Sequence, residues 1–173
     1  MRTSFLPLLL ALLLPGCTYA ISSAYTDRAE RGISFDRLAA EPDANAGKVF
    51  ILGGVIASCE PAQPAGTLIT VMQKPLDYWG RPIGTTKSGG AFLLYSSKRL
   101  DPFVFEPGRE ITAAGEAAGS KPAVLGGREF ADPVLIIREV KLWEKQQRSS
   151  PAGQPRWDDP LLQDHTHQTG RPD

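Results

Sequence analysis

Five short apolar runs, separated by turn-forming residues, limit the folds open to this chain. Their β-branched and alternating residues are typical of strands, and 17 glycines and 15 prolines among 173 residues favour many turns over long helices. Five strands without a long helix favour an all-β fold, a small five-stranded OB-like barrel, because closure removes exposed sheet edges; a β-sandwich is the alternative. The expected strands are 49–57, 67–73, 91–96, 109–118 and 133–143.

A glycine pair, Gly53-Gly54, lies inside the first expected strand. Paired glycines in a strand indicate a bulge or a sharp bend where a sheet coils into a barrel, or else a turn between two shorter strands; we favour the bend. Residues 34–40 combine a capping serine with helix formers ahead of Pro42, which predicts a short N-terminal helical segment. The chain length suits one domain, which we place at 34–145.

The amino terminus has the pattern of an export signal that ends at a cysteine. Met1 and Arg2 precede an apolar run of about ten residues, too short to span a membrane as a helix of about 20 residues. Residues 14–17, "LPGC", resemble the lipobox of bacterial lipoproteins, in which a small residue precedes the cysteine that carries diacylglycerol. Pro15 departs from the usual middle residue of that motif. We predict a lipoprotein signal peptide at 1–16.

Cleavage before Cys17 makes this cysteine the first mature residue, with its sulfur acylated and membrane lipid as its partner. Residues 17–33 then form a lipidated amino terminus and a polar tether. The alternative is cleavage after Ala20 or Ala24, which discards the cysteine. In Gram-negative lipoproteins, aspartate after the cysteine favours retention in the inner membrane; Thr18 stands there here, so resemblance to that rule implies the outer membrane.

Cysteine and histidine usage argues against catalysis. With the first cysteine acylated, Cys59 is the one remaining thiol, so an intramolecular disulfide is excluded. We predict that it is a partly buried strand residue, the alternative being an exposed thiol that pairs with another chain. The two histidines, His165 and His167, lie in the terminal tail, and no metal-ligand spacing or phosphate-binding glycine loop is present. We therefore predict no catalytic residue, no metal and no cofactor.

The stretch "PLDYWGRP" gathers polar and aromatic residues between two expected strands. Asp77, Tyr78, Trp79 and Arg81 are candidates for a recognition loop that binds a small molecule or a peptide. The structural alternative is a turn in which Trp79 covers one end of the barrel and Asp77 accepts hydrogen bonds from backbone amides. The sequence leaves both interpretations open.

Balanced charge argues against nucleic acid as a partner. Lys and Arg total 19, as do Asp and Glu, and few aromatic residues lie in the strands that an OB-like barrel uses for binding. Fold analogy alone does not establish function. We predict no nucleic-acid partner.

Four stretches of the domain resemble the Slp/YeaY family of starvation-inducible outer-membrane lipoproteins. The resemblance implies an acylated envelope lipoprotein, expected on the periplasmic face and active in envelope maintenance or stress tolerance, without an established enzymatic activity. One departure is an alanine where the family usually has arginine after the glycine pair 89–90. The stretches are "NAGKVFILGGVI", "GTLITVMQKPLDYWGRP", "SGGAFLLYSSKRLDPFVFEPGREITAAGE" and "DPVLIIREVKLW".

Residues 146–173 are polar and contain several prolines, which predicts a disordered tail because too little apolar surface is available to offset the ordering entropy. Within it, 156–162 ("RWDDPLL") is either a docking motif for an envelope protein partner or a cluster that packs weakly on the domain. Two histidines on a disordered segment rarely suffice to bind a metal.

Overall fold

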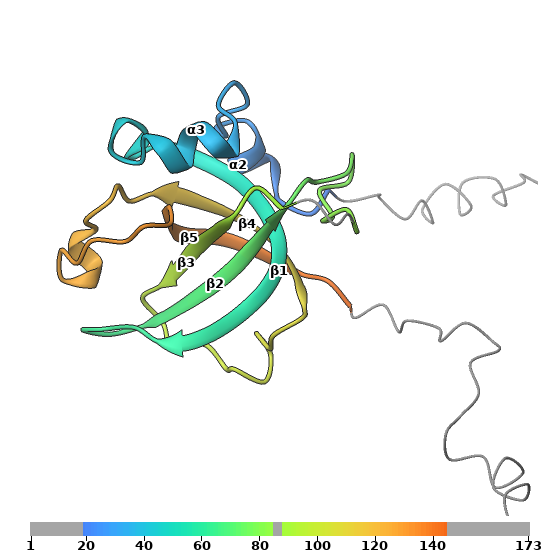
Figure 1. Cartoon of the computed structure of the whole chain (residues 1–173). Helices are drawn as coiled ribbons and strands as arrows, with labels where there is room; N and C mark the ends of the chain where they lie inside the picture. The colour runs from blue at the N-terminus through green and yellow to red at the C-terminus, as the bar shows by residue number, and fades with distance from the viewer. Residues whose placement is uncertain (1–18, 85–87, 145–173) are drawn as a thin grey trace, which may run out of the picture.

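A computed structural model describes residues 19–84 and 88–144 and contains one closed barrel of five strands (Figure 1). Neighbouring strands follow the order β1-β2-β3-β5-β4, and β4 pairs again with β1. Only the β3 and β5 pair is parallel. This closed arrangement confirms the predicted all-β, OB-like barrel over the sandwich. The strands are β1 (Val49–Pro61), β2 (Thr67–Lys74), β3 (Ala91–Ser96), β4 (Glu110–Ala117) and β5 (Val134–Leu142).

Strand β1 pairs with β4 along its first half and with β2 along its second half. Gly53 and Gly54 lie where the two pairings overlap, so the predicted bend within one continuous strand is confirmed. A Cβ atom at Gly54 would overlap the carbonyl oxygen of Met72, which shows why this approach requires glycine. The bulge in the β1–β2 register lies between Ile56 and Ser58, beyond the glycine pair.

Helix α3 (Phe35–Ala40) confirms the helical segment that the capping pattern predicts, and it packs against the barrel core. The Ser34 hydroxyl accepts a hydrogen bond from the Arg37 amide at 3.3 Å and caps the helix. Leu38 is 1% exposed and joins the core, and the Phe35 ring meets the Phe92 ring edge-on at 6.1 Å. The fully buried part of this core includes Ile56, Ile69, Val71, Phe92, Leu94, Ile111 and Leu135.

A second, smaller apolar cluster covers the outer side of β3. It includes Leu125 of the 3-10 helix η3 (Ala123–Leu125), an element that no sequence pattern predicted. Leu125 packs in the same cluster as Ala62, which follows β1, and Leu68, the second residue of β2. The helix η3 therefore lies near the start of β2. Another 3-10 helix, η2 (Asp43–Asn45), precedes β1.

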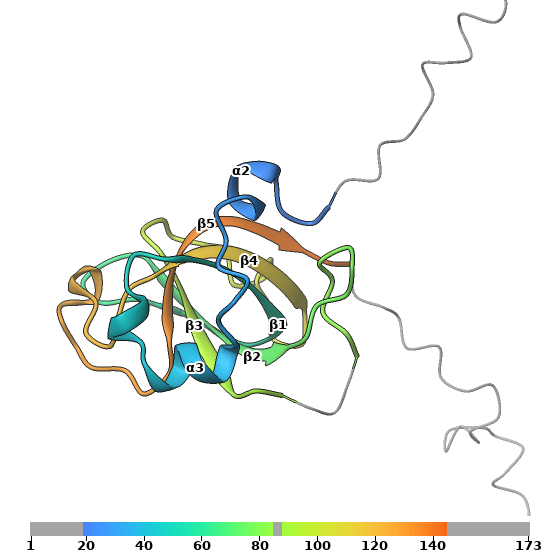
Figure 2. The same ribbon diagram turned by 90° about the horizontal axis from the view of Figure 1, so that it is seen from above.

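The described part of the predicted tether, residues 19–33, differs from an extended linker. Ile21 is 1% exposed, and the Ser22 amide and hydroxyl donate to the Glu139 carboxylate of β5 at 3.0 and 2.6 Å. The short helix α2 (Ser23–Thr26) follows and lies over β5, whereas α3 lies near β3 (Figure 2). An isolated apolar side chain and one exposed serine give no periodic signal, so the sequence could not reveal this packing. No helix in the described ranges is long and apolar enough to cross a bilayer.

Candidate functional site

The predicted recognition residues lie in a tight turn between β2 and β3, which we call the 76–83 loop. The Asp77 carboxylate accepts hydrogen bonds from the amides of Trp79 and Arg81, both at 2.8 Å. The Asp77 amide donates to the Arg81 carbonyl at 2.8 Å, and Gly80 adopts a left-handed φ of +83°. This confirms that Asp77 accepts from backbone amides, as the structural alternative predicts.

Aromatic side chains on this loop face outward. Tyr78 is 84% exposed and Trp79 is 49% exposed, and their rings meet edge-on with centroids 5.2 Å apart. About half of the Trp79 surface is therefore open to solvent. Tyr19, which is 41% exposed, extends the same region, because its ring lies beside Gly80. We call Tyr19, Tyr78 and Trp79 the aromatic patch.

The amino-terminal segment is joined to this loop. The Ala20 amide donates to the Trp79 carbonyl at 3.1 Å. Tyr19 lies so close to Gly80 that a Cβ atom there would sit 3.1 Å from the tyrosine Cζ atom. The patch thus combines residues that are far apart in sequence in one surface.

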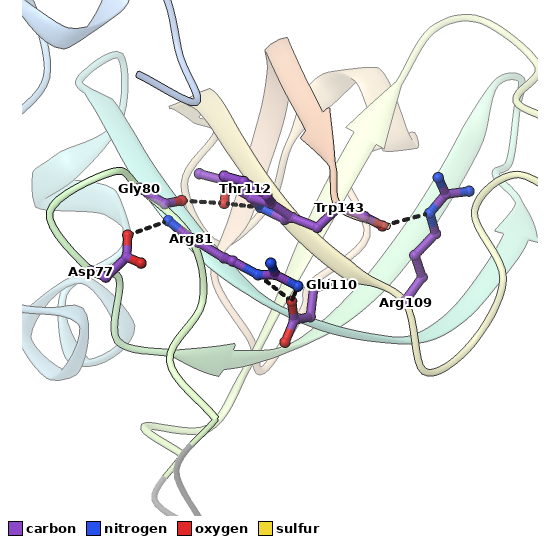
Figure 3. Close-up of polar contacts among 7 residues, drawn as sticks. All are labelled: Asp77, Gly80, Arg81, Arg109, Glu110, Thr112 and Trp143. Atoms are coloured by element: carbon purple, nitrogen blue, oxygen red, sulfur yellow. Dashed lines mark hydrogen bonds and ion pairs between the residues drawn. The ribbon is translucent and has the colours of Figure 1, made fainter. Parts of the chain in front are cut away.

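Arg81 points into the fold. Its Nε atom donates to Glu110 Oε2 at 2.9 Å, and its Nη2 atom lies 2.9 Å from the same oxygen as an ion pair without hydrogen-bond alignment (Figure 3). The guanidinium also lies 5.3 Å from the centre of the Trp143 ring, within the range of a cation–π contact. Through its contacts with Glu110, Arg81 fixes the 76–83 loop to β4.

Thr112 connects the loop to the chain that follows β5 (Figure 3). Its hydroxyl donates to the Gly80 carbonyl at 2.6 Å and accepts from Trp143 Nε1 at 3.0 Å, and the residue is fully buried. The Arg109 Nε atom in turn donates to the Trp143 carbonyl at 3.2 Å. Sequence reasoning missed Glu110, Thr112 and Trp143 here, because a single threonine or glutamate in a strand carries no signal of a distant partner.

A cavity of about 500 Å³ lies between the amino-terminal segment, β1 and the 76–83 loop. Its walls combine apolar and aromatic side chains with the charged Glu30 and Arg31; the Arg31 Nη2 atom also donates to the Thr26 carbonyl at 3.1 Å. Asp77 and Tyr78 line it, whereas Trp79 and Arg81 do not, so the four predicted residues do not converge on one cavity. Other lining residues are Tyr19, Ala29, Ile51 and Leu76.

Cys59 lies in β1 and is partly buried against the core, as predicted. Burial raises the pKa of its thiol, and the negative charges of Asp101 and Glu60 act in the same direction. The thiol is therefore protonated at neutral pH and is a poor nucleophile. Within the described ranges, no group of three or more potential metal ligands comes together.

Several predicted features lie outside the described residues. These are the signal peptide at 1–16, Cys17, the tail at 146–173 with its 156–162 segment, and the two histidines 165 and 167.

Comparisons with known proteins agree with the resemblance read from the sequence. The model of the outer membrane lipoprotein Slp family matches residues 14–168. No curated protein matches the chain. One similar solved structure is Rim1, a mitochondrial single-stranded DNA-binding protein from S. cerevisiae, with 9% identity and a TM-score of 0.34 over 57% of this chain and 97% of that chain. The strand order β1-β2-β3-β5-β4 of the closed barrel is what makes the fold OB-like. Because the family match spans most of the sequence, the chain belongs to the Slp family of outer membrane lipoproteins.

Proposed function

We propose that this chain is a lipid-anchored, non-enzymatic lipoprotein that faces the periplasm and acts in envelope maintenance or starvation and stress tolerance. The observation that carries the anchor is that the family match begins at residue 14 and so includes the "LPGC" motif. Signal peptide 1–16 is removed, and Cys17 carries diacylglycerol and an amide-linked chain such as palmitate. Each buried methylene contributes about 0.8 kcal/mol, so more than one chain gives stable anchoring.

The chemistry of the 76–83 loop supports a non-enzymatic role. The Asp77 carboxylate accepts hydrogen bonds from two backbone amides, and Arg81 donates to Glu110. The Thr112 hydroxyl donates to the Gly80 carbonyl and accepts from the Trp143 indole. Side chains held in this way stabilise the turn, which is a structural role for each of them. The protein acts through its exposed surface under this proposal.

Matched cysteine variants test the anchor. Cys17→Ser should move the protein from the outer membrane fraction to the soluble periplasmic fraction, because no acyl chains are attached. Cys59→Ser, the control, should stay with the outer membrane. Outer membrane retention of Cys17→Ser would contradict the anchor.

The cellular role is tested in a deletion strain. We expect increased permeability of the envelope to dyes in stationary phase, restored by the wild-type gene and not by Cys17→Ser. An unchanged envelope in the deletion strain under starvation would contradict this role.

A second candidate function is binding of a small molecule or peptide, favoured by the 500 Å³ cavity, whose volume falls within the range of ligand pockets. Tyr78 lines the cavity and contacts Trp79, so a bound ligand should change tryptophan fluorescence. A panel of amphiphilic small molecules and short peptides tests this, with Trp79→Phe expected to remove the signal and Tyr78→Ala to weaken binding. A panel without any saturable change would reject this function.

A further inference from the structure

The aromatic patch lies very close to the point where the proposed lipid is attached. Three residue steps separate Cys17 from Ala20, and an extended chain spans at most about 11 Å over that length. Ala20 is hydrogen-bonded to Trp79, with its amide 3.1 Å from the carbonyl. An acylated cysteine at the bilayer surface therefore brings the 76–83 loop to that surface.

We propose that Tyr19, Tyr78 and Trp79 form a membrane-seating surface that lies in the headgroup region of the bilayer. This inference rests on the proposed acylation of Cys17. It goes beyond an anchor, because it assigns one face of the barrel to the lipid and fixes the orientation of the domain.

The amino-terminal segment packs on the barrel, so it does not act as a flexible tether between the lipid and the domain. Ile21 is buried and Ser22 makes two hydrogen bonds to Glu139, so the chain is held on the barrel immediately after Ala20. The turn below the patch is equally constrained, since the Thr112 hydroxyl donates to the Gly80 carbonyl. The barrel is thus held near the membrane in one orientation.

The side chains of the patch suit a lipid interface. Tyrosine and tryptophan have an apolar body and a polar tip, and both are enriched where hydrocarbon meets water. Tyr78 exposes 84% of its surface and Trp79 exposes 49%, which is costly in water. The headgroup layer on each side of a bilayer is roughly 5 to 8 Å thick, enough to accept exposed rings while the folded barrel stays in water.

The opposite end of the barrel supplies an internal control. Strand β2 ends at the 76–83 loop and begins near η3, and its eight residues span about 26 Å at about 3.3 Å per residue. Figures 1 and 2 both show η3 (gold) and the 76–83 loop (green) at opposite ends of the molecule. Val124 in η3 is 39% exposed and is available for labelling.

The test uses the full-length lipoprotein reconstituted in vesicles of phosphatidylethanolamine and phosphatidylglycerol. In a Cys59→Ser background, Tyr78→Cys or Val124→Cys carries an environment-sensitive fluorophore, and nitroxide-labelled lipids serve as quenchers. We expect several-fold stronger quenching at position 78 than at position 124. Intrinsic tryptophan quenching, compared with and without Trp79→Phe, repeats the measurement with Tyr78 intact.

The outcomes distinguish contact of the 76–83 loop with the bilayer from attachment of the protein through its acylated cysteine. If the protein floats with the vesicles and both positions are quenched equally, or neither is quenched, the seating surface is overturned while the anchor stands. If the protein does not float, the acylation of Cys17 fails, and the seating surface fails with it.

Discussion

Two loops of this barrel use the same local chemistry. In the 76–83 loop, Asp77 accepts from the amide of Trp79 at 2.8 Å; in the 101–105 loop, Asp101 accepts from the amide of Phe103 at 2.9 Å. Each turn exposes an aromatic ring, with Tyr78 84% and Phe103 90% exposed. By turn type and exposure alone, the two loops would be equal candidates for a functional surface.

Each loop is also supported by a buried threonine. Thr112 joins Gly80 to Trp143, and Thr67 donates to the Lys98 carbonyl at 3.1 Å and accepts from the Leu100 amide at 2.9 Å. What differs is the surroundings. The 76–83 loop is bonded to the amino-terminal segment and borders the larger cavity, whereas the 101–105 loop is fixed by buried Phe105 and adjoins the region of Cys59. Position relative to the proposed anchor, not turn chemistry, distinguishes the loops.

The largest expected effect comes from the two threonines. Thr112→Val and Thr67→Val each leave polar groups without their partner, which should lower the free energy of unfolding by about 1 to 3 kcal/mol in each case. Only Thr112→Val should also reduce quenching of tryptophan by nitroxide lipids, because it releases the Gly80 turn. Denaturant unfolding followed by circular dichroism measures the first effect. Equal loss of lipid quenching in both variants would remove the distinction between the loops.

The Arg81–Glu110 ion pair should contribute less to the free energy of unfolding than either threonine. Its side chains are 29% and 25% exposed, so Arg81→Gln is expected to cost about 1 to 2 kcal/mol, between the values for exposed and buried pairs. Arg138→Gln, which breaks the more exposed pair with Glu116, is the control and should cost about 0 to 1 kcal/mol. Thermal or denaturant unfolding compares them. A larger loss for Arg138→Gln would contradict the assigned role of Arg81 in fixing the loop.

The exposed rings should matter little for stability. Tyr78→Ser and Phe103→Ser are each expected to change the free energy of unfolding by no more than about 0.5 kcal/mol, since neither ring is buried. Tyr78→Ser should weaken contact of the loop with vesicles, seen as reduced lipid quenching of tryptophan, and Phe103→Ser should not. If Phe103→Ser gives the larger reduction, the 101–105 loop is the one that faces lipid.

A third aspartate gives a small effect that depends on pH. Hydrogen bonds from the Ser120 amide at 2.8 Å and from its hydroxyl lower the pKa of Asp43 below its usual value of 3.8. A folded-state pKa below the unfolded value contributes stability that is present above about pH 4 and is lost as pH falls through the folded pKa. Asp43→Asn should flatten the stability profile in that acidic range, because the variant has no carboxylate to protonate, and should be slightly less stable than the wild type near pH 7. A profile identical to that of the wild type would contradict these hydrogen bonds.

Local patterns predicted much of the fold. β-branched runs between turns located all five strands, the paired Gly53 and Gly54 predicted the bend, and Ser34 predicted the cap of α3. These features depend on residues that are near one another in sequence. The parallel β3–β5 pairing, the burial of Ile21 and the packing of η3 depend on distant partners, which no local periodicity encodes.

The candidate site was predictable only in part. The sequence identified Asp77, Tyr78, Trp79 and Arg81 as neighbours, and the hydrogen bonds of Asp77 followed from turn chemistry. It could not show that Arg81 points inward, because Glu110 lies 29 residues away. The same limit applies to the contact between the amino-terminal segment and Trp79, on which the orientation of the barrel depends.

Mass spectrometry of the mature amino terminus tests the central claim most directly, because anchoring and seating both require an acylated first residue. We predict a mature chain that begins at Cys17 and carries the added mass of diacylglycerol and an amide-linked acyl chain. An unmodified chain that begins at Ile21 or Tyr25 would contradict the account.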